Sequence, residues 1–549
     1  MRNYLWRHPG HLFWILLAYL PWLGGMSVPL TGDQKVYLST ALEMRQQGSW
    51  LKPLLFGEAS YYKPPFQYWA TLVSWKIFGF NLFATLLPSV LCVVLIAWLL
   101  GEIALLLGER RWFVNAGLWF AAALGTMTYG TTAQMEIYLC FFYAASWWAG
   151  LKFLSRRNDR NEIRNWAWIF LAFGLAGLSA LVKSPLYSVF WVLSFVSYLL
   201  VSGEWLLFRQ RNLYLALLSG MGIGLAWYLT ILKVDGAHFW ADYAMRETWE
   251  KKGGNQGTLG SIWGALFYFC IPFTLLILPS LRAILRGRRT GGLMRFILCW
   301  SWPAALFFSF YPYRIKPYLF LLVPALAVLV DWGYFRVGRT LMFRLVMGFT
   351  GLVMFIALSG LALILQRAEL VPIWIISGMV VTGVITLICA SKNWMRGFVL
   401  CALAAVFFIR VGAVQIGEAD LKPLRDAVAG HPAAAVGMLD QDNGIWHEIG
   451  LLSVAIEKPM VRLHTVDEVS KFIADGGIVA LNDEQAGDFD ETIGNQVEVL
   501  KPGQTLKFQA WPRLKGRTKF PYRMLIEKGK RGVPDFDQLI HREFKILSL

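Results

Sequence analysis

Charged residues are scarce in this chain. Only 16% of its 549 residues are Asp, Glu, Lys or Arg, whereas a soluble domain carries about 25%. Hydrophobic residues make up 56%, and their runs are long enough for helices that cross a bilayer and too long for barrel strands. The composition excludes an ordinary soluble domain and predicts a polytopic α-helical membrane protein.

Several common site signatures are also missing. The six cysteines lie in apolar segments and show no CxxC or other ligand spacing, so we expect small core residues without a redox or metal role. No HExxH or similar pair of metal ligands occurs. The sequence predicts no metal site, and a divalent metal stays open as a cofactor.

The net charge of +17 does not indicate a nucleic-acid partner. Basic residues cluster in short connectors that alternate with poorly charged or acid-containing ones, which is the positive-inside pattern. These basic connectors are expected in the cytoplasm, and the first apolar run is expected to be an uncleaved span. Members of the clusters include Arg110, Arg111, Lys152, Arg156, Arg157, Arg209, Arg211, Arg286, Arg288, Arg336 and Arg339.

The apolar runs predict about 13 crossings. The segment 68–80 is short and 83–107 is long, so the two count as one broken span. The odd number keeps every basic connector in the cytoplasm and places residues after about 414 on the opposite side. The expected spans are 11–29, 68–80 with 83–107, 113–130, 136–151, 165–182, 185–201, 212–231, 261–281, 294–310, 317–334, 343–365, 371–390 and 396–413.

The composition changes near residue 417. Charged residues become frequent, and apolar runs shrink to strand length at 433–439, 459–463, 477–481 and 521–526. Between them Thr465 is followed by Glu468 three residues on, which is the pattern of a capped helix over 465–475. The pattern predicts a small α/β domain at 417–549 after a transmembrane domain at 1–416.

The loop 30–67 mixes charges and tyrosines between two apolar runs, whereas a plain connection needs only a few residues. Asp33 fits either a helix cap or a carboxylate held at the membrane surface. Lys63 begins a KPP turn and fits either a snorkelling lysine beside an aromatic belt or a phosphate clamp. Tyr61 and Tyr62 can donate hydrogen bonds to the same anion.

Other connectors expected on the same side carry further candidates. Arg314 and Lys316 lie in an aromatic segment and fit either an interfacial anchor or, with the Lys63 turn, two clusters around one anion. Glu136 begins a span, where it fits a helix N-terminus or a paired carboxylate. Lys183 joins two spans almost without a loop. The loop 232–260 fits a solvated linker or a lid.

Four segments carry a resemblance to a known family: GDQKVYLSTALEMRQQGSW, GEASYYKPPFQYW, LSALVKSP and RIKPYLFLLVPAL. In this order and spacing the chain resembles the GT-C membrane glycosyltransferases, which use polyprenyl-phosphate sugars. Within them it resembles the lipid A aminoarabinose transferase and protein O-mannosyltransferase-like family. The resemblance covers most of the chain and implies the GT-C fold, with the small α/β domain in the periplasm.

The resemblance also implies roles for the candidate residues. Asp33 matches the catalytic aspartate of the first loop, and Glu136 stands where relatives usually have a second aspartate. Lys63 matches the lysine of the FEKP-type motif, and Lys183 matches the K-[GS]-P motif after the middle spans. The Lys316–Tyr318 segment matches the late phosphate-side K-x-P-Y-like segment. The expected donor phosphate-binding residues are Lys63, Tyr61, Tyr62, Lys183, Arg314, Lys316 and Tyr318, and the expected lid or substrate contacts are Tyr37, Arg246 and Glu247.

The chain departs from the family at a few positions. Gln34 stands where relatives often have Glu, Val36 where they often have Arg, and Tyr62 where a Glu precedes the motif lysine. The family's Glu-His pair in the lid loop corresponds here to Glu247-Thr248. The missing Glu and His bear on whether a metal is bound. They also bear on the identity of the sugar, because acidic groups recognise the cation of an aminoarabinose donor.

The predicted function is that of an inverting glycosyltransferase. It moves a sugar from an undecaprenyl-phosphate-linked donor to lipid A or a related envelope glycolipid. We expect a monomer in the bacterial inner membrane with its site facing the periplasm. The alternatives are a protein O-mannosyltransferase, an O-antigen or capsule glycosyltransferase, and a lipid-sugar transporter. The polar residues gather at one face rather than at the bilayer midplane, which favours an enzyme over a transporter.

Overall fold

The computed structural model describes most of the chain. The described residues are 9–25, 33–55, 58–107, 115–156, 162–243, 245, 257–286, 291–367, 371–429, 435–439, 449–463, 465–475, 477–482, 498–499, 506–508 and 542–548.

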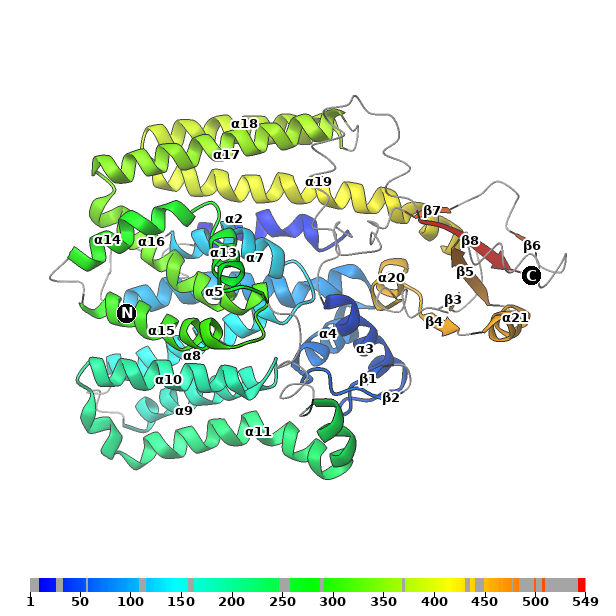
Figure 1. The fold of residues 1–549 in the computed structure, drawn as a ribbon, viewed down its shortest axis with the longest axis horizontal. Coiled ribbons are helices and arrows are strands. Elements are labelled where there is room, and N and C mark those ends of the chain that lie inside the picture. Colours follow the sequence, from blue (N-terminus) through cyan, green and yellow to red (C-terminus); the bar gives the residue numbers. More distant parts are fainter. Residues whose placement is uncertain are drawn as a thin grey trace.

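Helices dominate the structure and run side by side through most of its length (Figure 1). Among the described residues, nine helices are long and apolar enough to cross a membrane, or ten if one bent pair counts as a span. The polytopic helical fold is therefore confirmed, and the count of 13 crossings stays a prediction. The nine spans correspond to α5 (Leu82–Leu106), α8 (Glu136–Arg156), α9 (Glu162–Ala180), α11 (Arg211–Phe239), α15 (Gly291–Phe310), α16 (Val323–Val337), α17 (Leu341–Arg367), α18 (Ile373–Ser391) and α19 (Met395–Ala429), and α10 (Pro185–Val201) is a shorter apolar helix.

Shorter elements complete the helical part: α2 (Pro9–Tyr19), η1 (Leu20–Trp22), α3 (Gln34–Gln46), β1 (Leu54–Leu55), β2 (Glu58–Ala59), α4 (Phe66–Phe78), α6 (Ala116–Ala122), α7 (Leu124–Tyr129), η2 (Trp205–Arg209), α13 (Leu259–Phe269), η4 (Thr274–Leu276), α14 (Ile277–Arg286) and η5 (Lys316–Leu322). The predicted break between 68–80 and 83–107 corresponds to the junction of α4 and α5. Gly79, with φ of 85°, ends α4, and the Asn81 side chain accepts a hydrogen bond from the backbone N–H of Ala84 at the start of α5.

Two further helices are broken inside the bundle, where the sequence predicts straight spans. The expected span 113–130 divides at Ala123 into α6 and α7, and the expected span 261–281 bends by 102° between α13 and the η4–α14 segment. The breaks meet, because the Leu124 N–H donates to the Ile271 carbonyl over 2.8 Å. Ala123 and Cys270 are fully buried. Irregular backbone in a membrane protein is tolerated where other protein groups satisfy its hydrogen bonds, as the Ile271 carbonyl does for the Leu124 N–H.

Close helix contacts set the position of α11. Gly177 on α9 and Gly220 on α11 lie so close that a Cβ on Gly177 would stand 2.2 Å from the Gly220 carbonyl oxygen. Small residues allow such close approach between membrane helices. Further along, the Tyr228 hydroxyl donates to the Ala180 carbonyl over 2.8 Å. The C-terminal end of α11 therefore lies beside the turn that joins α9 to α10.

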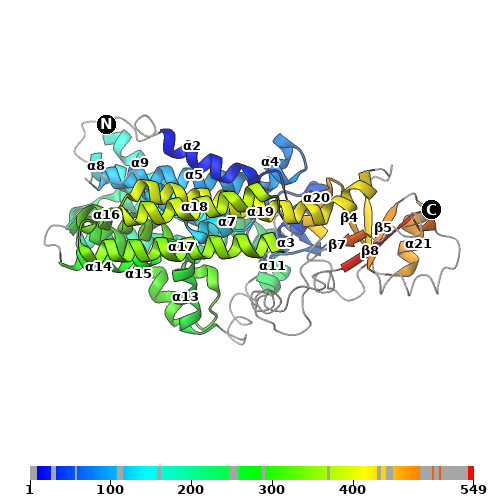
Figure 2. The same ribbon diagram turned by 90° about the horizontal axis from the view of Figure 1, so that it is seen from above.

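A sheet lies beyond one end of the helical bundle (Figures 1 and 2). Its strands are β3 (Val436–Leu439), β4 (Met460–Leu463), β5 (Ile478–Asn482), β6 (Glu498–Val499), β7 (Leu506–Phe508) and β8 (Arg542–Ser548), in the order β4-β3-β5-β8-β6, with β7 also on β8. Strands β3, β4 and β5 are parallel, and β8 is antiparallel to β5. The helices α20 (Ile449–Ile456) and α21 (Val466–Ala474) complete this part.

The local predictions for this part hold where the structure describes them. The predicted strands at 433–439, 459–463 and 477–481 correspond to β3, β4 and β5. The Thr465 hydroxyl accepts a hydrogen bond from the Glu468 N–H over 3.2 Å, as a cap of α21 should. The predicted strand 521–526 lies outside the described residues. Helix α19 runs through residue 417, and the domain boundary there stays a prediction.

Candidate active site

The loop between α2 and α4 brings Asp33 to tyrosine hydroxyls. Asp33 stands at the N-cap position of α3, but its side chain makes no cap hydrogen bond. Its Oδ2 instead accepts hydrogen bonds from the Tyr62 hydroxyl at 3.1 Å and the Tyr37 hydroxyl at 3.3 Å. Of the two sequence interpretations, the geometry favours a carboxylate held for use at the surface over a simple helix cap.

Lys63 lies directly beside this group. Its Nζ stands 4.5 Å from the centre of the Tyr62 ring, a cation–π contact, and the residue is only 5% exposed. The prolines that follow restrict the chain before α4 begins. The Phe66 N–H donates to the Leu181 carbonyl over 3.0 Å. The KPP turn is thus fixed to the turn between α9 and α10 that carries Lys183.

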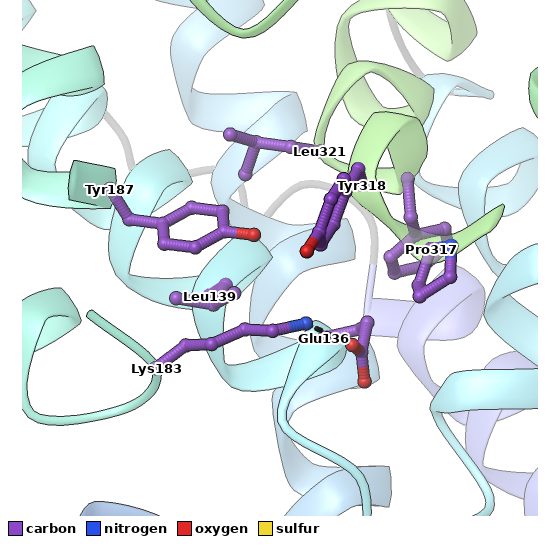
Figure 3. A pocket seen from close by; sticks show the side chains of 8 residues that line it. Glu136, Leu139, Lys183, Tyr187, Pro317, Tyr318 and Leu321 are labelled. Carbon is purple, nitrogen blue, oxygen red and sulfur yellow. Dashed lines mark hydrogen bonds and ion pairs between the residues drawn. The ribbon is translucent and has the colours of Figure 1, made fainter. Parts of the chain in front are cut away.

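A pocket opens next to this turn (Figure 3). The Lys183 Nζ forms an ion pair with Glu136 Oε1 at 2.7 Å and stands 5.5 Å from the centre of the Tyr318 ring. Figure 3 shows the hydroxyls of Tyr187 and Tyr318 pointing toward each other above this pair. The pocket is lined by Glu136, Leu139, Lys183, Tyr187, Pro317, Tyr318, Phe320 and Leu321.

Each residue of the pocket is placed by an ordinary local feature. Glu136 is the first residue of α8, where a carboxylate is favoured by the helix dipole. Lys183 lies in the short turn before α10, which begins at Pro185. Tyr318 lies in η5 and stacks on Phe308 of α15, with ring centres 4.2 Å apart.

Tyr37 connects Asp33 to the pocket electrostatically. Burial raises the pKa of the Tyr37 hydroxyl well above its usual value, and the carboxylates of Asp33 and Glu136 raise it further. The Gln34 side chain also accepts a hydrogen bond from the Ala133 N–H at 3.2 Å, which fixes α3 to the turn before α8. Asp33 and Glu136 therefore belong to one neighbourhood.

The charge of Lys183 is stabilised within this neighbourhood. Burial opposes its ammonium, but the adjoining carboxylate of Glu136 outweighs that effect and raises the pKa of Lys183 above its usual value. Lys183 therefore stays charged at neutral pH. The site combines fixed cations with carboxylates and tyrosine hydroxyls.

Other predicted site residues lie outside this group. The Tyr61 hydroxyl donates to Asp235 and so points away from Asp33. Arg314 donates to the backbone carbonyls of Ser309 at 3.1 Å and Gly257 at 3.4 Å. Lys316 is exposed at the start of η5. Arg246 and Glu247 lie outside the described residues. The assignment of all these residues to a working site stays a prediction.

Sequence reasoning did not single out two residues that the structure brings forward. Tyr187 lines the pocket opposite Tyr318. The signal in the sequence that could have indicated it is its position two residues after Pro185, at the start of α10. Asp235 counted as one charge among many in the loop 232–260, yet it contacts both Lys52 and Tyr61. Among the residues that the structure describes, no three His, Cys, Asp or Glu side chains gather as metal ligands.

The architecture agrees with the class of protein that the sequence resembles. A bundle of broken and straight membrane helices brings Asp33, Lys63 and the Glu136–Lys183 pair together at one end, where the loop before α4 meets the turns before α8 and α10. This is the arrangement implied for a GT-C membrane glycosyltransferase. Comparison with known proteins supports the class at three levels.

The family model for dolichyl-phosphate-mannose-protein mannosyltransferases matches residues 62–228. The undecaprenyl phosphate-alpha-4-amino-4-deoxy-L-arabinose arabinosyl transferase 2 of Proteus mirabilis is 26% identical over 310 residues, which cover 54% of each chain. The corresponding transferase 1 of Sodalis glossinidius is 28% identical over 342 residues, covering 56% of this chain and 58% of the relative. The chain thus matches little more than half the length of these relatives.

Among solved structures, ArnT from Cupriavidus metallidurans bound to undecaprenyl phosphate matches with a TM-score of 0.65 and 17% identity. The match covers 90% of this chain and 97% of ArnT. The apo state of the same protein matches with a TM-score of 0.64. These findings confirm the predicted fold and the predicted resemblance to the GT-C aminoarabinose transferase family. The chain is a multi-pass membrane protein of that fold.

Proposed function

We propose that this chain transfers a sugar from an undecaprenyl-phosphate-linked donor to lipid A or a related envelope glycolipid. The observation that carries the proposal is the site itself. Asp33, Lys63 and the Glu136–Lys183 pair meet at one end of a bundle that has the ArnT fold. The names of the curated relatives and the lipid in the ArnT structure support the donor class.

The charges suit this reaction. The acceptor oxygen bonds to the anomeric carbon while the bond from that carbon to the donor phosphate oxygen breaks. The electron pair leaves with the phosphate, and the sugar becomes oxocarbenium-like. Lys63 and Lys183 would act as fixed cations that stabilise the leaving phosphate, and one such preorganised donor contributes about 2.7–4 kcal/mol. Attack opposite the leaving group inverts the anomeric centre.

Glu136 also balances the charge of Lys183. It neutralises Lys183 while no donor is bound, so the ammonium is not a buried, unpaired charge. A donor phosphate then shares Lys183 with Glu136. Lys316 and Tyr318 of η5, with Arg314 shortly before it, would complete the phosphate side, and Tyr37 would contact the sugar.

The role of Asp33 depends on the acceptor. A lipid A phosphate is already ionised and needs no base, so Asp33 would then orient the sugar. A hydroxyl acceptor must lose its proton, and Asp33 would then serve as the base. The pH dependence of the transfer rate separates the two cases, because only a required base makes the rate fall as that base becomes protonated.

The predicted topology supports a periplasmic site. With the basic connectors in the cytoplasm, the loop 30–67 and the turns before α8 and α10 face the periplasm of a bacterial inner membrane. The sheet-containing part lies at the same end of the bundle (Figure 2). The chain would act there as a monomer on two lipid substrates.

Transfer followed by mass spectrometry tests the proposal. The purified protein receives undecaprenyl-phosphate sugars together with lipid A, and the expected product is sugar-modified lipid A. The match to the mannosyltransferase family model makes a protein acceptor the second candidate. Sugar found on protein alone would replace lipid A as acceptor, and no transfer from any polyprenyl-phosphate sugar would refute the enzyme.

A further inference from the structure

Tyr61 is held by two aspartates that belong to one segment. Its side chain is fully buried, and its hydroxyl donates to Asp235 Oδ2 over 2.7 Å. Its backbone N–H donates to Asp242 Oδ2. Both aspartates lie at the C-terminal end of α11 or directly after it. Hydrogen bonds to a charged acceptor are among the stronger ones in proteins, so the position of Tyr61 is well determined.

A kink in α11 makes this arrangement available. Asp235 has φ of −150° and ψ of 46°, which are not helical values, although the helix continues on both sides. The helix has 29 residues, and about 20 suffice to cross the hydrocarbon core. Its last turns therefore reach past the core, and the kink turns them toward the first loop.

Other contacts join the same two segments. Lys52 Nζ lies 3.3 Å from the Asp235 Oδ2 that also accepts the Tyr61 hydroxyl. The Trp227 indole N–H donates to the Leu51 carbonyl over 2.9 Å. The Tyr61 ring packs edge-on against Phe239, with ring centres 5.4 Å apart. We call the residues Lys52, Tyr61, Trp227, Asp235 and Asp242 the α11 clamp.

The clamp acts on the residues next in the chain. Tyr62 and Lys63 follow Tyr61 directly, and Tyr62 contacts both Asp33 and Lys63. Pro64 and Pro65 restrict the backbone on the other side. Tyr62 and Lys63 are therefore held from both directions, by the clamp before them and by the proline turn after them.

We propose that Asp235 and Asp242 are positioning residues that hold Tyr61 and thereby set Tyr62 and Lys63 in the orientation required by a lipid phosphate. The inference rests on the proposed function for the identity of that phosphate. It gives α11 a role in the site although α11 supplies no residue to the pocket.

Binding of undecaprenyl phosphate to the purified full chain tests the role. Asp235→Asn and Tyr61→Phe keep the shape of the contact and weaken it. Each is expected to raise the Kd about tenfold, the effect of losing one hydrogen bond to a charged group. Tyr214→Phe is the matched control, because Tyr214 lies on the same helix at its other end and donates to the Phe208 carbonyl. Its Kd should equal that of the unmodified chain.

The background of Lys63→Ala separates positioning from general stability. If Asp235 acts through Lys63, Asp235→Asn should change the Kd of the Lys63→Ala protein less than twofold. The same tenfold loss in both backgrounds would overturn the proposal. Amide exchange of residues 58–63 gives a second measurement: Asp242→Asn should accelerate it, and unchanged exchange would also overturn the proposal.

Failure of the proposed function would look different. If the unmodified chain binds undecaprenyl phosphate but transfers no sugar, the enzyme is refuted while the positioning role is still decided by the Kd values. If transfer occurs and the Lys63→Ala background leaves the tenfold effect intact, the enzyme stands and the positioning role falls.

Discussion

Helix α8 takes part in two buried Lys–Glu pairs, one at each end. At its first turn Glu136 pairs with Lys183 at 2.7 Å, and near its last turn Lys152 pairs with Glu102 of α5 at 3.1 Å. The side chains are similarly buried in both pairs. The first pair lines a pocket with two tyrosines, whereas the second lies near the Trp148 ring, 5.6 Å from the Lys152 Nζ. A buried ion pair alone does not mark a site; its surroundings do.

The physical difference is access. Glu136 and Lys183 line a pocket, and in the proposed function a phosphate would compete with Glu136 for Lys183 there. Lys152 of α8 and Glu102 of α5 are both buried between their helices. If one of the two charges is removed, the other charge remains in a desolvated environment. The first pair is thus suited to function and the second to stability.

The largest expected effect is on the stability pair. Lys152→Ala should lower the free energy of unfolding by about 3–5 kcal/mol, because the buried Glu102 carboxylate loses the ammonium that lies 3.1 Å from it. Thermal unfolding in detergent measures the change. The double variant Lys152→Met with Glu102→Leu is the control and should recover most of the loss. If the single variant were as stable as the unmodified chain, the comparison between the two pairs would collapse.

Substitution of Asp33 or Lys63 should mainly lower the transfer activity. Asp33→Asn and Lys63→Ala should each lower kcat/KM by a factor that corresponds to about 2.7–4 kcal/mol of transition-state stabilisation. The apparent Tm of the Asp33→Asn protein in detergent should change little, because Asp33 is exposed. Near-normal transfer by both variants would remove these residues from the site.

Glu136→Gln sharpens the comparison further. The change frees Lys183 for a phosphate, so undecaprenyl phosphate should bind more tightly by about 1.5 kcal/mol, roughly tenfold, while sugar transfer slows. Equilibrium binding and steady-state transfer are measured on one preparation. Glu102→Gln is the matched substitution at the other end of α8 and should leave the lipid affinity unchanged. Weaker binding by the Glu136 variant would contradict the shared use of Lys183.

The smallest loss of stability is expected for the exposed pair Lys52–Asp235. Its lysine side chain is 36% exposed and its carboxylate 24% exposed. Lys52→Met should therefore lower the free energy of unfolding by no more than about 1 kcal/mol, since water and salt screen such pairs. Unfolding of the unmodified chain and of the Lys52→Met protein is measured at low and at high salt. The small difference in stability between the two should disappear at high salt, where the ion pair is screened. A loss as large as that of Lys152→Ala would mean that exposure does not separate these pairs.

The sequence predicted much of the fold from composition and spacing. Apolar runs, the break before Leu82 and the cap at Thr465 were all local signals, and the structure shows each of them. The sequence also indicated Asp33, Glu136 and Lys183 as candidates, because charged residues at membrane boundaries are costly and therefore informative. It did not separate Lys152 from the basic connectors, although Lys152 lies within α8 and pairs with Glu102.

The breaks at Ala123 and between α13 and η4 were missed for a related reason. Their segments are as apolar as straight spans, and each break is stabilised by contact with the other through Leu124 and Ile271. Hydropathy reports the solvent that a segment prefers. It does not report whether a distant backbone group will accept its hydrogen bonds.

By itself the sequence determined that this chain is a helical membrane protein with charged, tyrosine-rich loops on one side, since hydropathy and charge act residue by residue. Only the tertiary structure decided how those loops are used. Tyr61 and Tyr62 are neighbours with the same side chain, yet one is bound by Asp235 of α11 and the other by Asp33. Their directions depend on hydrogen-bond partners far away in the chain, and only the tertiary structure brings each partner to its tyrosine.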